Sequence, residues 1–314
     1  MYQVIGRRLL QSIPMLFFIS IVCFALIKFA PGDPVQSFVT PNMKPEDVER
    51  MRHSLGLDQS NYVQYFLWLK HLLTGDLGYS LINNRPVLDQ IISRLPATVG
   101  LMGASLAIAV ILAVPLGMLA AVNRNRFVDK LLNIISYIGI SIPTFWLSIL
   151  LIYIFALQFH LLPSMGMRTI GQDTVFDIIK HGVLPCIVLS FSFLSVYIRY
   201  VRSNTIGQLK EDYVQTQYAF GSSKLQILFR HVMKNVLLPI ITLLGLSFGD
   251  LITGAIITET VFSWPGLGSL GVTAAFGFDY PIIMGITMFS SLMLIVGNLL
   301  ADILYSVVDP RIKV

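Results

Sequence analysis

The sequence predicts an all-α polytopic membrane protein with six transmembrane helices. Of its 314 residues, 55% are hydrophobic and only 12% are charged, whereas a soluble domain has about 25% charged residues. Six apolar runs, each close to the length that crosses a bilayer, alternate with polar segments. The formal net charge of +5 comes from basic residues at the ends of these runs. That distribution fits anionic lipid and argues against a nucleic-acid partner.

Residues 1–94 form one predicted unit, the first span with a cap. Residues 9–27 are free of charge for 19 residues, close to the roughly 20 that a spanning helix needs. Arg7 and Arg8 precede this run as in a signal peptide, but no small-residue cleavage site follows, so we expect a retained helix. Residues 30–34 (APGDP) end it. The long polar stretch that follows has amphipathic patches at 48–55 and 62–73, which predict a small folded cap.

Residues 95–307 contain the other five predicted spans. Residues 95–123 and 131–159 are each charge-free for 29 residues, with a short basic turn between them. Pro115 and Pro143 lie inside these two runs. A proline break in a bilayer persists where neighbouring helices or a water-filled cavity satisfy the freed backbone groups. Both prolines are therefore candidates for lining a pathway, with an ordinary packed kink as the alternative. The remaining spans are predicted at 182–198, 235–258 and 280–301, and residues 308–314 form a tail.

The distribution of lysine and arginine predicts the orientation. Six spans place both termini on one side. If that side is the cytoplasm, it carries 13 basic residues and the opposite side carries 8. Most of the 8 lie in the long loop after the first span, and long loops cross a membrane largely regardless of charge. We therefore expect cytoplasmic N- and C-termini.

The polar, mostly basic segment at about 203–235 is the predicted meeting place with a partner. Its pattern indicates two short helices broken at Gly221, with Ser222 or Ser223 as the next N-cap. The second helix has an apolar face and the first carries aromatic residues among polar ones. A docking surface is one interpretation, and an amphipathic connector resting on lipid headgroups is the other. The apolar face is Leu225, Leu228, Phe229, Val232 and Met233, and the aromatic residues are Tyr213, Tyr218 and Phe220.

Asp250, near the middle of the fifth predicted span, is the most informative charge within the membrane. An ionisable group at that depth costs a few kcal/mol and normally faces a partner or a water-filled cavity. Asp250 is thus a candidate pathway residue, with a hydrogen-bonded helix seam as the alternative. Gly245 and Gly249 form a small-xxx-small pair that predicts close helix packing. Glu259 and Asp302, nearer the ends of their runs, are expected at the membrane interface.

Motifs for catalysis, metal binding and nucleotide binding are missing or out of context. Gly266, Gly268 and Gly271 match G-x-G-x-x-G, but no strand precedes them. The sequence has no G-x-x-x-x-G-K-[ST], no H-E-x-x-H and no G-x-S-x-G. Cys23 and Cys186 lie inside apolar runs and are expected as core residues. We predict no catalytic residue and no metal ligand. A polytopic membrane enzyme acting on lipid or peptide is the alternative function, and an ion channel is a weaker third.

Several motifs resemble the permease subunits of binding-protein-dependent ABC importers, in particular the oligopeptide, dipeptide and nickel permeases. They are PGDP after the first span, LGLDQ at 55–59, GDLGYS at 75–80, TETVFSWPGLG before the last span and VDPRI at 308–312. Gly221, which lies ten residues after Glu211 and eighteen before Pro239, matches the cytoplasmic loop of that family. The resemblance implies the type I ABC importer permease fold with an extracellular cap between helices 1 and 2.

In that family the cytoplasmic loop forms coupling helices that insert into a groove of the ATPase subunit. Gln215, Thr216 and Gln217 stand where the broad family favours Glu-Ala-Ala, and Phe220 stands where peptide permeases often carry a basic residue. The docking role is still implied. The residues that the resemblance places at the ATPase contact are Glu211, Asp212, Tyr213, Gln215, Thr216, Tyr218, Phe220 and Gly221.

The same resemblance implies partners, cargo and location. The chain would pair with a second, related permease in the inner membrane of a bacterium. It would sit on two ATPase subunits that use ATP and Mg, bind no cofactor itself, and receive cargo from an external binding protein. The cargo would be a peptide, or nickel or another metal chelate. In the family, an acid at the place of Asp250 is more typical of nickel-type members.

Overall fold

The computed structural model describes residues 2–29, 35, 43–54, 56–253 and 256–308, without the side chains at 2–5, 7–9, 51, 54, 246, 248–253 and 301–308. Within this part of the chain the regular structure is helical, apart from one isolated antiparallel bridge between Tyr79 and Pro86. The helices in chain order are α1 (Tyr2–Phe29), α2 (Pro45–Ser54), α3 (Asn61–Leu73), α4 (Val87–Val122), α5 (Phe127–Ser141), α6 (Thr144–Leu151), the π-helix η2 (Ile152–Gln158), α7 (Val175–Gln208), α8 (Asp212–Ala219), α9 (Lys224–Gln226), the π-helix η3 (Ile227–Val232), α10 (Met233–Thr253), α11 (Ile256–Val261), α12 (Leu267–Phe276) and α13 (Tyr280–Val308).

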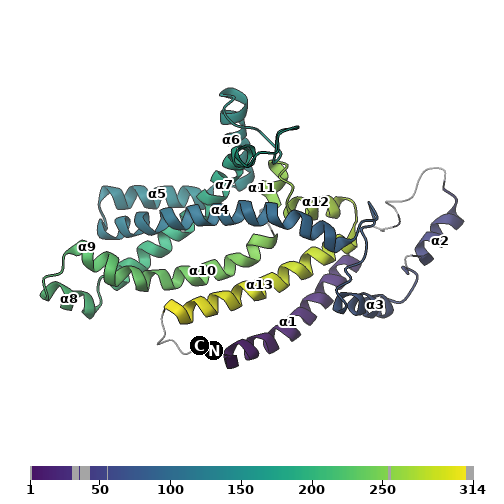
Figure 1. Cartoon of the computed structure of the whole chain (residues 1–314), viewed down its shortest axis with the longest axis horizontal. Coiled ribbons are helices and arrows are strands. Elements are labelled where there is room, and N and C mark those ends of the chain that lie inside the picture. Colours follow the sequence, from purple (N-terminus) through teal and green to yellow (C-terminus); the bar gives the residue numbers. More distant parts are fainter. Residues whose placement is uncertain (1, 30–34, 36–42, 55, 254–255, 309–314) are drawn as a thin grey trace.

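Five helical stretches are long and apolar enough to cross a membrane, and a sixth candidate span is a bent pair. The five are α1, α4, α7, the continuous helix from α9 through η3 into α10, and α13. They run along one another in Figure 1, with α8 and α9 at one end of the bundle and α12 at the other. We call these the α8 end and the α12 end. The beginning of α1 and the end of α13 both point toward the α8 end (Figure 1).

The predicted third span at 131–159 is not one helix. α5 ends at Ser141, α6 begins at Thr144, and the two halves are bent by 100°. Ile142, just before Pro143, has an extended backbone with φ −74° and ψ 123°, because a proline ring disfavours the helical conformation in the residue before it. α5 has 15 residues, so its length of about 22 Å is less than the roughly 30 Å of hydrocarbon. α6 and η2 project sideways from the bundle (Figure 1).

Three other predicted spans lie inside longer helices. α4 begins at Val87 instead of 95, α7 runs over Val175–Gln208 instead of 182–198, and the helix that contains the fifth span begins at Lys224 instead of 235. Charged residues end an apolar run without ending a helix, so hydropathy places the membrane part and not the helix ends. Pro115 lies inside the uninterrupted α4, so it breaks no span, unlike Pro143.

α4 and α7 form the central pair of the bundle, with α5 beside them (Figure 1). Close approach depends on two glycines. A Cβ on Gly117 of α4 would lie 2.6 Å from the Cβ of Val201 in α7, and Gly139 of α5 faces Ser195 of α7 with no space for a side chain. Small residues at such crossings bring backbones together where lipid offers no hydrophobic driving force.

α1 and α3 lie at the edge of the bundle. Only 11% of the apolar stretch of α1 is buried, against 50% in α7. The ring of Tyr65 in α3 packs edge-on against Phe24 with centroids 5.4 Å apart, and its hydroxyl is 2.8 Å from the Ser20 hydroxyl. The two amphipathic patches of the predicted cap are thus helices, α2 and α3. Residues 30–34 and 36–42, which include the APGDP motif, lie outside the described residues.

Candidate functional site

The predicted hairpin is present as α8 and α9 at one end of the bundle. α8 ends at Ala219 with Phe220 as its C-cap, and Gly221 follows with φ 79°, a left-handed conformation that glycine adopts without steric cost. Ser223 caps the next helix by accepting a hydrogen bond from the Gln226 N–H at 3.3 Å, and the Gln226 side chain accepts one from the Ser223 N–H at 3.0 Å. The prediction of a break at Gly221 is confirmed. Of the two candidate N-caps, Ser223 is the one used.

Polar side chains and a buried valine hold the hairpin against the bundle. The Tyr213 hydroxyl donates to Gln208 Oε1 at 2.8 Å, and Asn235 Nδ2 donates to the same oxygen at 2.8 Å. Val214 is 1% exposed in a cluster with Val201 and Ile227. Burial raises the pKa of Tyr213, so its hydroxyl keeps the proton that it donates. Tyr213, expected at the contact surface, is therefore an anchor of the hairpin.

The apolar face predicted for the second helix is wrong in part. Its residues do not share one face: Leu228 and Val232 are buried in the bundle together with Ile227, whereas Leu225 and Phe229 are exposed. The reason is the π-helix η3, whose i→i+5 hydrogen bonds widen the turn and shift the buried face. The buried positions consequently follow a spacing of five and then four, from Ile227 to Val232 to Val236.

The displaced side chains give the hairpin an exposed apolar surface. Phe220 is 81% exposed, Leu225 66%, Phe229 53% and Tyr218 46%. Four large apolar side chains so close in sequence are more than a solvated loop requires. Among the other predicted contact residues, Glu211, Asp212, Gln215, Thr216 and Gly221 are exposed on the same hairpin.

An ion pair that sequence reasoning missed ties α5 to α7 at the α8 end. Arg202 of α7 contacts the Asp129 carboxylate through Nε at 2.5 Å and Nη2 at 2.9 Å. Asp129 also accepts from the Asn125 N–H at 2.8 Å and from Asn133 Nδ2 at 2.8 Å. The Asp129 side chain is 3% exposed, so all its hydrogen bonds are within the protein. The sequence contained one signal for this ion pair, because Asp129 is the one acidic residue in the basic turn at 124–130.

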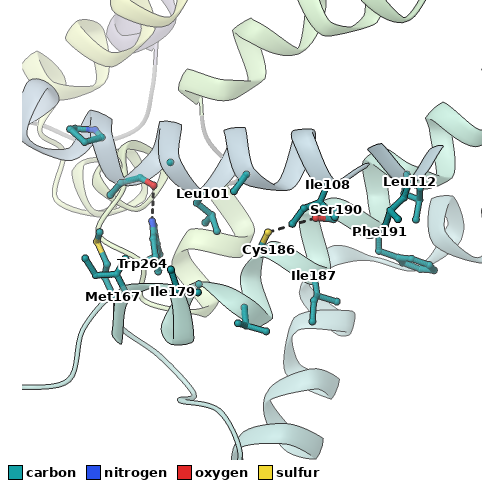
Figure 2. A pocket seen from close by; sticks show the side chains of 18 residues that line it. Leu101, Ile108, Leu112, Met167, Ile179, Cys186, Ile187, Ser190, Phe191 and Trp264 are labelled. Carbon is teal, nitrogen blue, oxygen red and sulfur yellow. Dashed lines mark hydrogen bonds between the residues drawn. The ribbon is translucent and has the colours of Figure 1, made fainter. Parts of the chain in front are cut away.

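An apolar groove of about 720 Å³ runs between α4 and α7 (Figure 2). Leu101, Ile108 and Leu112 of α4 line it together with Ile187 and Phe191 of α7, which Figure 2 labels. At one end Trp264 donates its indole N–H to the Ala97 carbonyl at 2.9 Å. Pro115 and Pro143, the two predicted pathway prolines, do not line this groove and are exposed on the surface of the chain.

Glu259, expected near the membrane interface, is 0% exposed because other parts of the chain cover it. Its Oε1 accepts from the Thr98 hydroxyl at 2.7 Å and its Oε2 from the Ser269 N–H at 3.1 Å, while Thr98 accepts from the Leu267 N–H at 2.7 Å. Glu259 and Thr98 thus satisfy backbone N–H groups in the first turn of α12, whose N-cap is a glycine without a side chain.

The G-x-G-x-x-G match is explained by the same carboxylate. A Cβ on Gly266 would collide with the Glu259 carboxylate, and a Cβ on Gly268 would lie 2.7 Å from the Ile256 Cα. These glycines make room for protein atoms at a helix–helix junction. The pattern is therefore structural here, as the absence of a preceding strand predicted.

Another buried acid ties one of the motifs that carried the family resemblance to the turn before α13. Asp279, 2% exposed, accepts from the Ser80 hydroxyl and from the Leu81 N–H at 3.1 Å. Ser80 is the last residue of GDLGYS, and Asp279 precedes α13. The segment after α3 is thus fastened to the turn before the last span.

The remaining predicted residues lie on α10 and α13. The backbones of Gly249 and Asp250 are helical within α10. The burial of Gly249 and the side chains of Asp250 and Asp302 are not described, so their predicted roles stay predictions. Gly245 is buried, as close helix packing requires. Among the described residues no group of three or more His, Cys, Asp or Glu side chains could hold a metal ion.

Comparison with known proteins connects this architecture to one family. The sequence model of the "Binding-protein-dependent transport system inner membrane component" matches residues 113–314, and that of the corresponding N-terminal component matches residues 1–102. An oligopeptide transport system permease protein, AppB of Bacillus subtilis, is 40% identical over 309 residues, 98% of each chain. A dipeptide permease, DppB of Alkalihalophilus pseudofirmus, is 37% identical over 98% of each chain.

Two further comparisons agree with these. The glutathione transport system permease protein GsiC of Escherichia coli K12 is 37% identical over 313 residues, 100% of this chain and 99% of that one. A chain of the inward-facing MetNI methionine ABC transporter superposes with a TM-score of 0.57 at 14% identity, covering 71% of this chain and 97% of that one. This likeness shows the type I importer fold. The enzyme alternative draws no support from these relatives, which are named as permeases. The chain belongs to the family of inner-membrane permease components of binding-protein-dependent ABC importers.

Proposed function

We propose that this chain is the permease subunit of a peptide importer and that the α8–α9 hairpin is its contact with a separate ATPase subunit. The observation that carries the proposal is the exposed apolar surface of Tyr218, Phe220, Leu225 and Phe229 on a firmly anchored hairpin. The sequence similarity to permeases named for oligopeptides, dipeptides and glutathione supports a peptide as cargo.

The anchoring suggests how movement of the ATPase would reach the membrane helices. Gln208 at the end of α7 binds both Tyr213 in α8 and Asn235 in α10. The Asp129–Arg202 ion pair then ties α7 to α5. A displacement of the hairpin would therefore shift α5, α7 and α10 together instead of bending a loop.

The partners follow from the family. ATP and Mg would be bound by two ATPase subunits at the α8 end, which we place in the cytoplasm. A second, related permease would complete the translocation pathway, and a binding protein would deliver the peptide at the α12 end. The α4–α7 groove is the apolar surface that we assign to the pathway side of the chain. Nickel or a metal chelate is the second cargo class. The residue that supports this second class is Asp250, because a carboxylate favours a cationic cargo. The cationic N-terminus of a peptide would satisfy the same condition.

The test compares two exposed phenylalanines at opposite ends of the bundle. Phe220 is 81% exposed on the hairpin and Phe276 is 85% exposed at the end of α12. We expect Phe220→Ala, combined with Leu225→Ala, to reduce copurification of the ATPase subunits at least fivefold, because large apolar anchors dominate such contacts. Phe276→Ala should leave it unchanged. The measurement is the ATPase-to-permease ratio after affinity purification of the whole importer.

Uptake of labelled peptides and of nickel by cells with the importer distinguishes the cargo. Peptide uptake should fall with the Phe220→Ala, Leu225→Ala variant and persist with Phe276→Ala. Equal ATPase retention in both variants would show that the hairpin rests on lipid headgroups. Uptake of nickel without uptake of peptides would contradict the proposal that the cargo is a peptide.

A further inference from the structure

A second apolar cleft, of about 740 Å³, lies between α1, α3 and α13 toward the α12 end. It is separate from the α4–α7 groove and lies beside the helices that the N-terminal part of the chain adds. Its walls are mainly aliphatic and aromatic side chains, among them Leu16 and Phe17 of α1, Leu69 and Leu73 of α3, and Phe289 and Leu292 of α13.

The polar side chain in this wall is already bonded within the protein. Ser20 donates its hydroxyl to the Phe17 carbonyl at 2.6 Å and lies 2.8 Å from the Tyr65 hydroxyl. Ser20 is 1% exposed, so its oxygen is not available to a ligand. The surface of the cleft is therefore apolar. A polar ligand would lose its hydrogen bonds to water there without replacing them.

The cleft lies along the apolar parts of two predicted membrane spans. Leu16 and Phe17 lie within the apolar stretch 10–29 of α1, and Leu292 lies within the stretch 280–300 of α13. Phe17 is 48% exposed and Leu292 44% exposed, so the cleft opens onto the exposed apolar surface of these spans. α3 adds Phe66, 62% exposed, and Tyr62, 80% exposed. Tyrosine is one of the two aromatic residues enriched at the membrane–water boundary.

The size of the cleft distinguishes between the two apolar occupants available at that depth. A helix about 10 Å across fills about 400 Å³ per turn, so 740 Å³ holds less than two turns of a neighbouring subunit's span. An acyl chain is narrow and flexible enough to follow the wall. We propose that this cleft seats an acyl chain of a membrane phospholipid in the leaflet at the α12 end, and that this chain packs the loosely held α1 and α3 against α13.

The experiment uses the assembled importer in nanodiscs made with a phosphatidylcholine that carries a diazirine near the middle of one acyl chain. After illumination, adducts are mapped by mass spectrometry. Adducts at residues 16–20 and 288–292 should exceed those around Ile111, a residue of α4 that is 69% exposed and outside the cleft. Leu292→Trp should reduce the cleft adducts at least fivefold by filling the space. Leu300→Trp on the same helix is the matched control, because Leu300 is 40% exposed and does not line the cleft.

A second variant, Leu16→Trp, fills the cleft from the opposite wall and should act like Leu292→Trp. Size-exclusion profiles and ATP hydrolysis establish that each variant assembles. Equal labelling of the cleft and the Ile111 surface would reduce the site to bulk lipid and overturn the proposal. So would equal adducts in Leu292→Trp and Leu300→Trp, a free fatty acid in place of phospholipid in the purified importer, or a cross-link from cysteine at Leu292 to a partner subunit.

Discussion

Glu259 and the glycines beside it show how single residues join the helices at the α12 end. The φ of Gly266 is −101°, which any residue adopts, so its requirement is for space and not for backbone conformation. The Glu259 carboxylate occupies that space because it bonds α12 and α4 at once. An acid 161 residues from its partner Thr98 thereby sets the packing of a short helix.

The prediction at this scale is that Gly266→Ala destabilises the importer. Its Cβ would collide with the Glu259 carboxylate, and overpacking of this kind costs about 1–3 kcal/mol. The measurement is the thermal midpoint of the purified complex by fluorescence-detected size exclusion, which should fall by several degrees. Gly271→Ala in the same motif is the control, because its Cβ would meet Ile286 at an ordinary 3.8 Å.

Shortening the acid is the rescue for this variant. Gly266→Ala combined with Glu259→Asp should recover part of the lost midpoint, because the shorter carboxylate withdraws from the new methyl group. Equal midpoints for Gly266→Ala and Gly271→Ala would mean that the carboxylate moves aside without cost.

Whole elements are positioned by pairs of side chains at their ends. Asp129 is the third residue of α5, and its carboxylate accepts the Asn125 N–H just before that helix, where the helix dipole favours negative charge. Arg202 brings α7 to the same carboxylate, and Arg199 one turn earlier lies 5.1 Å from the centre of the Tyr137 ring in α5. The α5–α7 contact is thus set by charge at the α8 end and by the close approach of Gly139 further along.

We predict that Asp129→Asn destabilises the importer by about 3 kcal/mol, since removing one partner leaves a partly buried guanidinium unpaired. Asp173→Asn is the matched control. Its Arg168–Asp173 pair also joins an arginine to an aspartate at 2.5 Å, but the side chains are 49% and 86% exposed, and exposed pairs contribute about 0–1 kcal/mol. The denaturation midpoint of Asp129→Asn should fall well below that of Asp173→Asn, which should stay close to that of the unchanged importer. If they are equally stable, the Asp129–Arg202 pair does not hold α5 to α7.

At the scale of the whole molecule, the order of the spans determines the sidedness on which coupling depends. The beginning of α1, the end of α13 and the α8–α9 hairpin lie at the same end of the bundle (Figure 1). The loop between η2 and α7, residues 159–174, belongs to the other side in the predicted orientation. The distribution of lysine and arginine predicts that the first group is cytoplasmic.

Cysteine labelling in intact cells measures this orientation. In a variant without Cys23 and Cys186, Gln172→Cys should react with a membrane-impermeant maleimide from outside, because Gln172 is exposed in the loop at 159–174. Thr216→Cys, exposed on α8, should react only after the membrane is permeabilised. The reverse pattern would invert the orientation and place the hairpin outside the cell.

The sequence by itself determined the helical class, the membrane location, five of the six predicted spans and the break at Gly221. These follow from local chemistry: apolar run length, charge at the run ends, and a glycine followed by a capping serine. Tertiary structure decided the rest. The burial of Glu259 depends on Thr98, the burial of Asp129 depends on Arg202, and the role of Tyr213 depends on Gln208 and Asn235. The π-helix η3 moved Leu225 and Phe229 to the surface against an α-helical count. A 3.6-residue periodicity describes one helix alone, whereas partners distant in the chain and local changes of helix geometry become visible only once the helices are packed.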